Sequence, residues 1–113
     1  MHEVSLVSDL VDVVRVRAAG ARVRRVRVRY ATTFPDGALA QAWTLLTAGD
    51  PLADAALEAR PFEIVLACPC GFHGPLGHDD VIGPTLAACP ACGELRRTPA
   101  TSELELLEVR TAP

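Results

Sequence analysis

Four cysteines, arranged as two pairs in the second half of the chain, are the residues best suited to chemistry. The first pair is Cys68-Pro69-Cys70, the second is Cys89-Pro90-Ala91-Cys92, and eighteen residues (71–88) separate them. Thiolate pairs at about this separation are typical of a zinc ribbon, in which each pair occupies a tight turn and tetrahedral Zn²⁺ joins the two turns. The spacing therefore predicts a structural Zn²⁺ site.

The first pair is one residue shorter than the usual Cys-x-x-Cys knuckle, so its sulfurs cannot adopt the geometry of the second pair. If this short pair is strained, His73 or His78 could replace one cysteine as a ligand. Two disulfides are an alternative that a reducing compartment disfavours. Four free thiols are another, which would leave a loop-rich segment with little core unsupported.

The amino terminus, Met1-His2-Glu3, is the second feature that could bind a metal. Removal of an initiator methionine needs a small second residue, so His2 should preserve Met1, whose α-amino group has a pKa near 7.7–8.0. This amine, the following backbone nitrogens and the His2 imidazole can close fused chelate rings around one ion. Four nitrogens in a plane suit Ni²⁺ or Cu²⁺ and do not suit tetrahedral Zn²⁺. The alternative is a terminus without fixed structure.

Basic residues gather in one stretch, where seven arginines lie between Arg15 and Arg29 with no acidic residue among them. A surface with so many arginines could bind a nucleic acid or an acidic partner protein. No aromatic residue alternates with these arginines, however, and predicted strands carry acidic residues that could neighbour them: Glu58, Glu63, Glu103 and Glu105. We therefore expect cross-strand ion pairs on a solvent-facing side of a sheet.

Length and composition exclude several classes of protein. The 113 residues, half of them apolar and 22% charged, fit one globular domain with a small lobe and exclude a multidomain enzyme and a disordered chain. The net charge of −3 disfavours nucleic acid as the main partner. No apolar run approaches the roughly 20 residues of a membrane span, and no signal peptide opens the chain, so we expect a cytoplasmic protein without a membrane partner.

Apolar residues at three- and four-residue steps predict two helices. The first covers residues 4–19, and the second follows Pro35 and ends near Ala48. The apolar face of the first consists of Val7, Leu10, Val11, Val14 and Ala18, and that of the second of Leu39, Ala42, Trp43 and Leu46.

Three strands are predicted over residues 22–30, 57–67 and 103–110. The first is predicted because apolar residues at 26, 28 and 30 alternate with arginines at 25, 27 and 29. Pro61 lacks a backbone donor, so the second strand should lie at a sheet edge or bend there. In the third strand, Leu104 and Leu106 are followed by Leu107 and Val109. This change of parity predicts a bulge between the two pairs.

Together these elements predict an α/β (α+β) fold, a two-layer sandwich of a small mixed sheet with both helices on one face. Residues 1–67 and 94–113 form this domain, and residues 68–93 are inserted as a zinc-ribbon-like lobe. We expect no enzyme, because no set of residues supports catalysis. Glu3 beside His2 could mimic an acid/base pair, but an open terminus offers no walled pocket to position a substrate.

Several segments, in the right order and over nearly the whole chain, resemble the HypA/HybF hydrogenase nickel-incorporation family. They are Met1-His2-Glu3-Val4-Ser5-Leu6, Arg25-Val26-Arg27-Val28-Arg29, Leu46-Thr47-Ala48-Gly49-Asp50-Pro51-Leu52 and the lobe with paired cysteines. The resemblance implies a nickel metallochaperone that carries Ni²⁺ as cargo during maturation of nickel–iron hydrogenase, and sometimes of urease. It also implies two partners, a nickel-binding GTPase and the hydrogenase large subunit.

The resemblance further implies two sets of metal ligands. Met1, His2 and Glu3 would bind Ni²⁺, and the zinc ligands would be Cys68, Cys70, Cys89 and Cys92. The alternative function is a zinc-ribbon adaptor that binds proteins or nucleic acid, with an incidental Met-His-Glu start. Extending the amino terminus by two residues separates these hypotheses, because only nickel binding should suffer.

Overall fold

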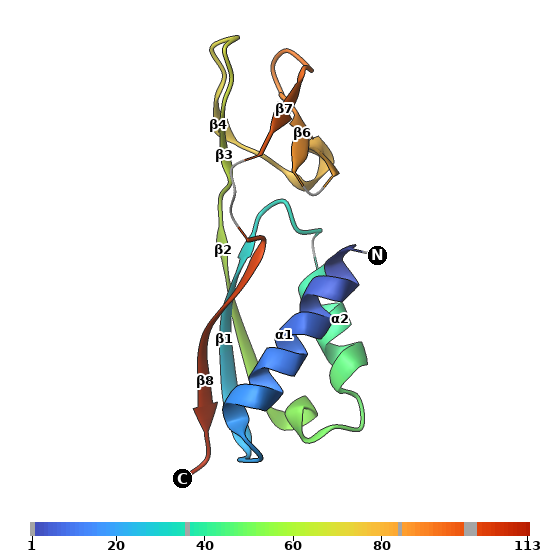
Figure 1. The fold of residues 1–113 in the computed structure, drawn as a ribbon, viewed down its shortest axis with the longest axis vertical. Coiled ribbons are helices and arrows are strands. Elements are labelled where there is room, and N and C mark those ends of the chain that lie inside the picture. The colour runs from blue at the N-terminus through green and yellow to red at the C-terminus, as the bar shows by residue number, and fades with distance from the viewer. Residues whose placement is uncertain (1, 36, 84, 99–101) are drawn as a thin grey trace.

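The molecule is elongated, about 53 × 23 × 18 Å, with a helical half at one end and a lobe of short strands at the other (Figure 1). The computed structural model describes residues 2–35, 37–83, 85–98 and 102–113. The helical elements are α1 (His2–Ala18), α2 (Ala38–Thr47) and the 3-10 turns η1 (Pro51–Asp54) and η2 (His78–Asp80). The strands are β1 (Val23–Ala31), β2 (Ala56–Phe62), β3 (Val65–Ala67), β4 (His73–Pro75), β5 (Val81–Gly83), β6 (Leu86–Ala88), β7 (Leu95–Arg97) and β8 (Leu104–Thr111).

The helical half is a two-layer sandwich. Its sheet has the order β2-β1-β8, with β1 parallel to β2 and antiparallel to β8, and both helices cover the same face (Figure 1). The predicted fold class, a small mixed sheet with two helices on one face and an inserted cysteine-bearing lobe, is confirmed.

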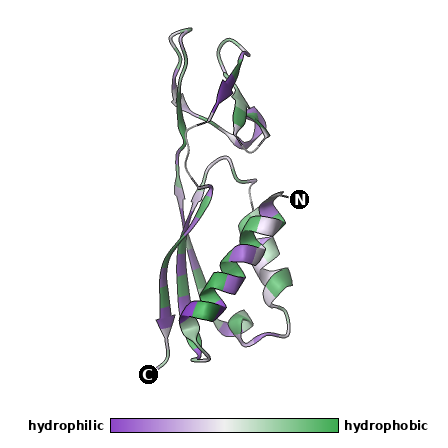
Figure 2. Cartoon of the chain, viewed as in Figure 1, coloured by the Kyte–Doolittle hydropathy of each residue, from purple (hydrophilic) through white to green (hydrophobic). Residues whose placement is uncertain are grey.

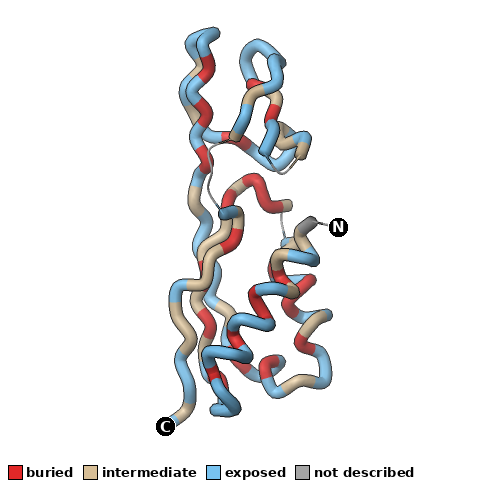
Figure 3. The backbone as a smooth tube through the Cα atoms, viewed as in Figure 1, coloured by how far each residue is buried: buried red, intermediate tan, exposed pale blue. Residues whose placement is uncertain are grey.

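Burial follows the periodicity of the sequence. The predicted face of α1, from Val7 to Ala18, is buried, and so are Leu39, Ala42 and Trp43 of α2 (Figure 3). Along β1, Val26 and Val28 are fully buried, and hydrophobic and hydrophilic residues alternate (Figure 2). The many valines of α1 have modest helix propensity, so the contact of this face with the sheet stabilises the helix.

The two outer strands show the predicted irregularities. In β8, Arg27 pairs with Glu108 and Val28 pairs with Leu106, so Leu107 is the extra residue of a bulge. Pro61 lies in β2, an edge strand, as predicted. The single strand expected over residues 57–67 is instead two strands, because the chain leaves the first sheet after Phe62 and begins the lobe at β3.

The lobe consists of a β3-β4 hairpin and a β5-β6-β7 sheet. A second, smaller buried cluster lies here; it joins Ala31, at the end of β1, to the lobe residues Ile64, Leu66, Cys68, Leu76, Ala87 and Cys89. Two of these residues are cysteines, so the lobe has few apolar side chains of its own.

Neither helix in the described part of the chain combines the length and the apolar character that a membrane crossing needs.

Candidate metal centre

The four cysteine sulfurs gather at one point of the lobe. All four Sγ atoms lie within 4.8 Å of one another, and no other group of three or more His, Cys, Asp or Glu ligand atoms in the described residues is this close. Cys68 Sγ lies 3.8 Å from Cys92 Sγ, and Cys70 Sγ lies 3.7 Å from Cys89 Sγ. All four are free cysteines, so the alternative of two disulfides does not describe this structure.

These distances fit a tetrahedral metal ion. With Zn–S bonds of about 2.3 Å, a tetrahedron holds neighbouring sulfurs roughly 3.8 Å apart. The Cys68–Cys92 and Cys70–Cys89 sulfur pairs match that edge, and each joins one cysteine of the first pair to one of the second. The cluster therefore suggests a metal site such as zinc.

Each pair sits on a tight turn, and the first turn is one residue shorter. The carbonyl of Cys68 accepts a hydrogen bond from Gly71 N at 2.9 Å, three residues on, whereas that of Cys89 accepts from Gly93 N at 2.8 Å, four residues on. Both glycines have positive φ, 104° and 77°, a region that side chains disfavour. The two glycines thus allow both turns to close despite their different lengths.

In each cysteine pair, the surroundings lower the pKa of one thiol and raise that of the other. The pKa of Cys68 is lowered to about 7, mainly because the Cys70 backbone N–H stabilises its thiolate. The Phe72 N–H favours the Cys70 thiolate, but the neighbouring Cys68 and burial outweigh it and raise its pKa to about 12.

The second pair shows the same division. Burial opposes ionisation of Cys89, but the N–H groups of Cys92 and Ala91 outweigh it and lower its pKa. The Glu94 N–H favours the Cys92 thiolate, whereas burial and the Cys89 sulfur raise its pKa overall. One thiol of each pair is therefore ready to bind a cation, and the others lose their protons as the metal binds.

The two candidate substitute ligands lie elsewhere. His73 begins β4 and is exposed, and neither His73 nor His78 belongs to the group of close ligand atoms. His78 Nδ1 lies 3.0 Å from the carbonyl oxygen of Thr33, which joins η2 to the connection after β1. This contact holds the lobe against the helical half.

Arg96 is a residue near the cysteines that the sequence analysis does not single out. It is the inward-facing residue of β7, between Leu95 and Arg97, which are exposed. The nearby Cys68 sulfur is the main cause of a raised pKa for its guanidinium. Alternation within β7 is the one sequence pattern that could indicate its inward position, and a strand of three residues is too short for that pattern to be recognised.

The amino-terminal end of α1 points toward the lobe (Figure 1). Met1 lies outside the described residues, as does the side chain of His2. Glu3 borders a cavity of about 190 Å³ whose other walls come from the connection after β1, from the lobe and from the start of the last strand: Thr33, His78, Val81, Ile82, Gly83 and Glu103. The predicted nickel-binding end of the chain is therefore close to the lobe.

The arginines of β1 have acidic partners on the neighbouring strands. Glu58 of β2 pairs with Arg25 and Arg27, each at 3.3 Å, and Glu105 of β8 pairs with Arg29 at 2.8 Å. The predicted cross-strand ion pairing is confirmed for these residues. The paired carboxylates reduce the positive potential that a nucleic acid would need.

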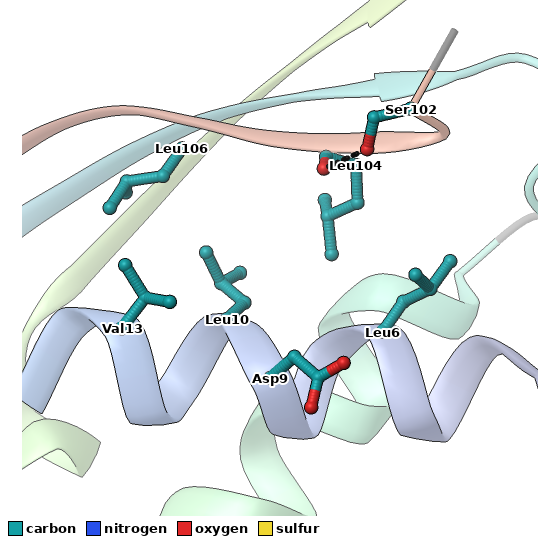
Figure 4. Close-up of a pocket in the computed structure, with 7 residues that line it drawn as sticks. All are labelled: Leu6, Asp9, Leu10, Val13, Ser102, Leu104 and Leu106. Carbon is teal, nitrogen blue, oxygen red and sulfur yellow. Dashed lines mark hydrogen bonds between the residues drawn. The ribbon is translucent and has the colours of Figure 1, made fainter. Parts of the chain in front are cut away.

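A groove of about 260 Å³ separates α1 from β8 (Figure 4). Its walls are mostly apolar side chains, with Asp9 and Ser102 as polar residues: Leu6, Leu10 and Val13 from α1, and Leu104 and Leu106 from β8. The Ser102 hydroxyl donates to the Leu104 carbonyl at 2.8 Å. The groove lacks the converging polar groups that orient a substrate for catalysis.

Comparisons with known proteins identify the family. The family model for hydrogenase/urease nickel incorporation, metallochaperone HypA, matches residues 1–111. The solved structure of the nickel metallochaperone HypA from Helicobacter pylori has a TM-score of 0.58 and 19% sequence identity, over 96% of each chain. Another HypA solution structure has a TM-score of 0.56 and 17% identity, over 99% of this chain and 97% of that chain. No curated protein matches the sequence.

At these identities the solved structures show a shared fold, and the family assignment rests on the sequence match over residues 1–111. That match includes both the Met-His-Glu start and the two cysteine pairs. The chain belongs to the HypA family of hydrogenase/urease nickel-incorporation metallochaperones.

Proposed function

We propose that this chain binds Ni²⁺ at its amino terminus and delivers it, together with a nickel-binding GTPase, to the large subunit of nickel–iron hydrogenase. The observation that carries the proposal is the family match, which begins at Met1 and includes His2 and Glu3. The nickel ligands are the terminal amine of Met1, the imidazole of His2 and the backbone nitrogens of His2 and Glu3.

The start of α1 supports this ligand set. The helix begins at His2, and the first N–H groups of a helix have no acceptor within it. These amides can therefore lose a proton to a metal without breaking a helical hydrogen bond. The positive end of the helix dipole also stabilises the negative charge of a deprotonated amide.

The two metal sites have different tasks. Zn²⁺ bound by Cys68, Cys70, Cys89 and Cys92 is structural, because four thiolates close its coordination shell and join two turns of a lobe with a small core. Ni²⁺ at a chain terminus is cargo, because a terminus can be approached by a receiving protein.

Substitution of His2 tests the nickel site. His2→Ala removes the imidazole, and a two-residue extension moves the free amine, so each should abolish tight Ni²⁺ binding in a calorimetric titration. Zinc content and the far-ultraviolet helical signal should stay unchanged, and His73→Ala should bind Ni²⁺ like the parent. Affinity of the parent should rise from about pH 6 to 8, as the imidazole and the amine lose their protons.

Full nickel affinity in His2→Ala, with an unchanged absorption spectrum of the bound ion, would show that the ligand set is wrong. The zinc-ribbon adaptor would then become the better hypothesis.

A further inference from the structure

The two cysteine turns differ in the number of backbone donors that reach their first sulfur. Two backbone N–H groups, those of Ala91 and Cys92, favour the Cys89 thiolate and lower its pKa, whereas one, that of Cys70, does so for Cys68. The shorter turn explains the difference. The donor three residues after Cys68 is the Gly71 N–H, which already bonds to the Cys68 carbonyl at 2.9 Å.

In the longer turn, the Cys89 carbonyl accepts its hydrogen bond from the residue four positions later. Gly93 N donates to the Cys89 carbonyl at 2.8 Å, which leaves the Cys92 N–H for the Cys89 sulfur. Hydrogen bonds to metal-bound thiolates matter because four thiolates around Zn²⁺ carry a net charge of −2, and outer-shell partners adjust that charge density. The short pair therefore lacks one donor that the other pair has.

Arg96 is placed to supply the missing donor. Its strand β7 pairs with β6 so that Arg96 lies opposite Ala87, a fully buried member of the cluster that also contains Cys68. Its Nη2 donates to Glu94 Oε2 at 2.7 Å, which anchors one end of the guanidinium. Its Nε is shielded from solvent and has no hydrogen-bond partner among the described residues, and a buried donor of this kind is costly without an acceptor.

We propose that the Arg96 guanidinium donates the second hydrogen bond to the Cys68 thiolate when the site holds zinc, in place of the backbone amide that the short pair lacks. The guanidinium also places one positive charge beside the doubly negative zinc–thiolate group. Arg96 is thus a positioning residue of the zinc site, and the inference rests on the proposed zinc site.

Competition with a chromophoric chelator tests the proposal on the full chain loaded with zinc. Arg96→Gln should weaken zinc binding roughly 10–100-fold, the usual effect of losing an outer-shell partner. Arg97→Gln is the matched control, because it removes the same charge from the exposed side of the same strand, and it should bind zinc like the parent. Arg96→Lys keeps the charge and has N–H donors on one nitrogen but loses the planar fork, so it should retain part of the affinity.

A second background tests whether Arg96 replaces a backbone amide. Insertion of one glycine between Pro69 and Cys70 restores a full Cys-x-x-Cys turn and its second amide donor. In that background Arg96→Gln should have little effect on zinc affinity. With Co²⁺ in place of zinc, Arg96→Gln alone should also move the thiolate-to-metal charge-transfer band to longer wavelength, because the sulfur becomes a better electron donor.

Equal zinc affinities for Arg96→Gln and Arg97→Gln would overturn the proposal, and so would an equal loss in both backgrounds. If the unmodified, reduced chain holds no zinc by elemental analysis, the zinc site itself is wrong. That result is distinct from a chain that binds zinc but does not respond to Arg96.

Discussion

Asp50 connects η1 and α1, two elements of the helical half, through its carboxylate. Its Oδ1 accepts a hydrogen bond from Leu52 N at 2.8 Å and so caps η1, while its Oδ2 lies 2.6 Å from Arg15 Nη2 near the end of α1. The Leu52 N–H and then Arg15 hold the pKa of Asp50 below its ordinary value of 3.8. The folded state therefore binds the proton of this group less readily than the unfolded state.

This lowered pKa predicts an acid-dependent loss of stability. The contribution of ionised Asp50 is fully present above pH 3.8 and is lost as the pH falls through the lower pKa of the folded state. Asp50→Asn should therefore lower the melting temperature at pH 6 but have a smaller effect near pH 3. Thermal unfolding followed by circular dichroism checks this.

Asp54→Asn, an exposed change in the same turn, is the control and should follow the parent. A constant difference between Asp50→Asn and the parent across the pH range would show that the ionised carboxylate contributes nothing.

At the scale of elements, the bulge in β8 lets a strand whose apolar residues do not alternate regularly direct those on both sides of the bulge toward the core. Leu104 is buried, and Leu106 and Val109 pack against the same cluster on the helix-covered face, whereas Leu107 is 48% exposed. Without Leu107 the strand reads Leu-Glu-Leu-Glu-Val-Arg, a strict alternation of inward and outward residues. The bulge therefore absorbs one extra residue and keeps both halves of the strand in phase.

This explanation predicts that deletion of Leu107 is tolerated. The shortened strand should keep the pairs of Val28 with Leu106 and of Arg27 with Glu108, now as consecutive rungs. Thermal unfolding and amide chemical shifts should show the parent fold. Deletion of Glu105 is the control, since it shifts Leu104 toward the open face and should destabilise the protein. Equal damage from both deletions would contradict this account.

Elements of this kind are predictable from sequence because burial repeats with the period of the element. The faces of α1 and β1 and the bulge at Leu107 all follow from the spacing of apolar residues. The break between β2 and β3 was not predictable, since Pro61 indicates only an edge or a bend, and tertiary packing moves the chain from one sheet to the next. The second helix begins at Ala38, three residues later than Pro35 suggests.

At the scale of the whole molecule, there are two separate buried clusters, and the second reaches from the lobe to Ala31 at the end of β1. The helical half is held by the faces of α1, α2 and the sheet, and the lobe by a few residues around Leu76 and the cysteines. Cysteine spacing alone was enough to predict that the four sulfurs come together. The Arg96 contact and the bond between His78 and Thr33 were not predictable, because each joins segments that only the folded chain brings together.

Loss of the metal should therefore unfold one half. Cys92→Ala, or removal of zinc by a chelator, should abolish hydrogen-exchange protection in the lobe from β3 to β7 and leave that of β1 intact, because metal-binding energy is local folding energy. Leu95→Ala, an exposed change in β7, is the control and should keep protection throughout. Loss of protection in β1 as well would show that the halves fold as one unit.

The bulge at Leu107 has a further consequence, for encounters between molecules. A flat outer strand exposes unpaired backbone groups that invite edge-to-edge polymerisation, and a bulge twists such an edge out of plane. On the opposite side of the sheet, Pro61 lacks the N–H that an added strand would need. The sheet thus resists open-ended aggregation at both of its borders, which favours separate molecules over fibres.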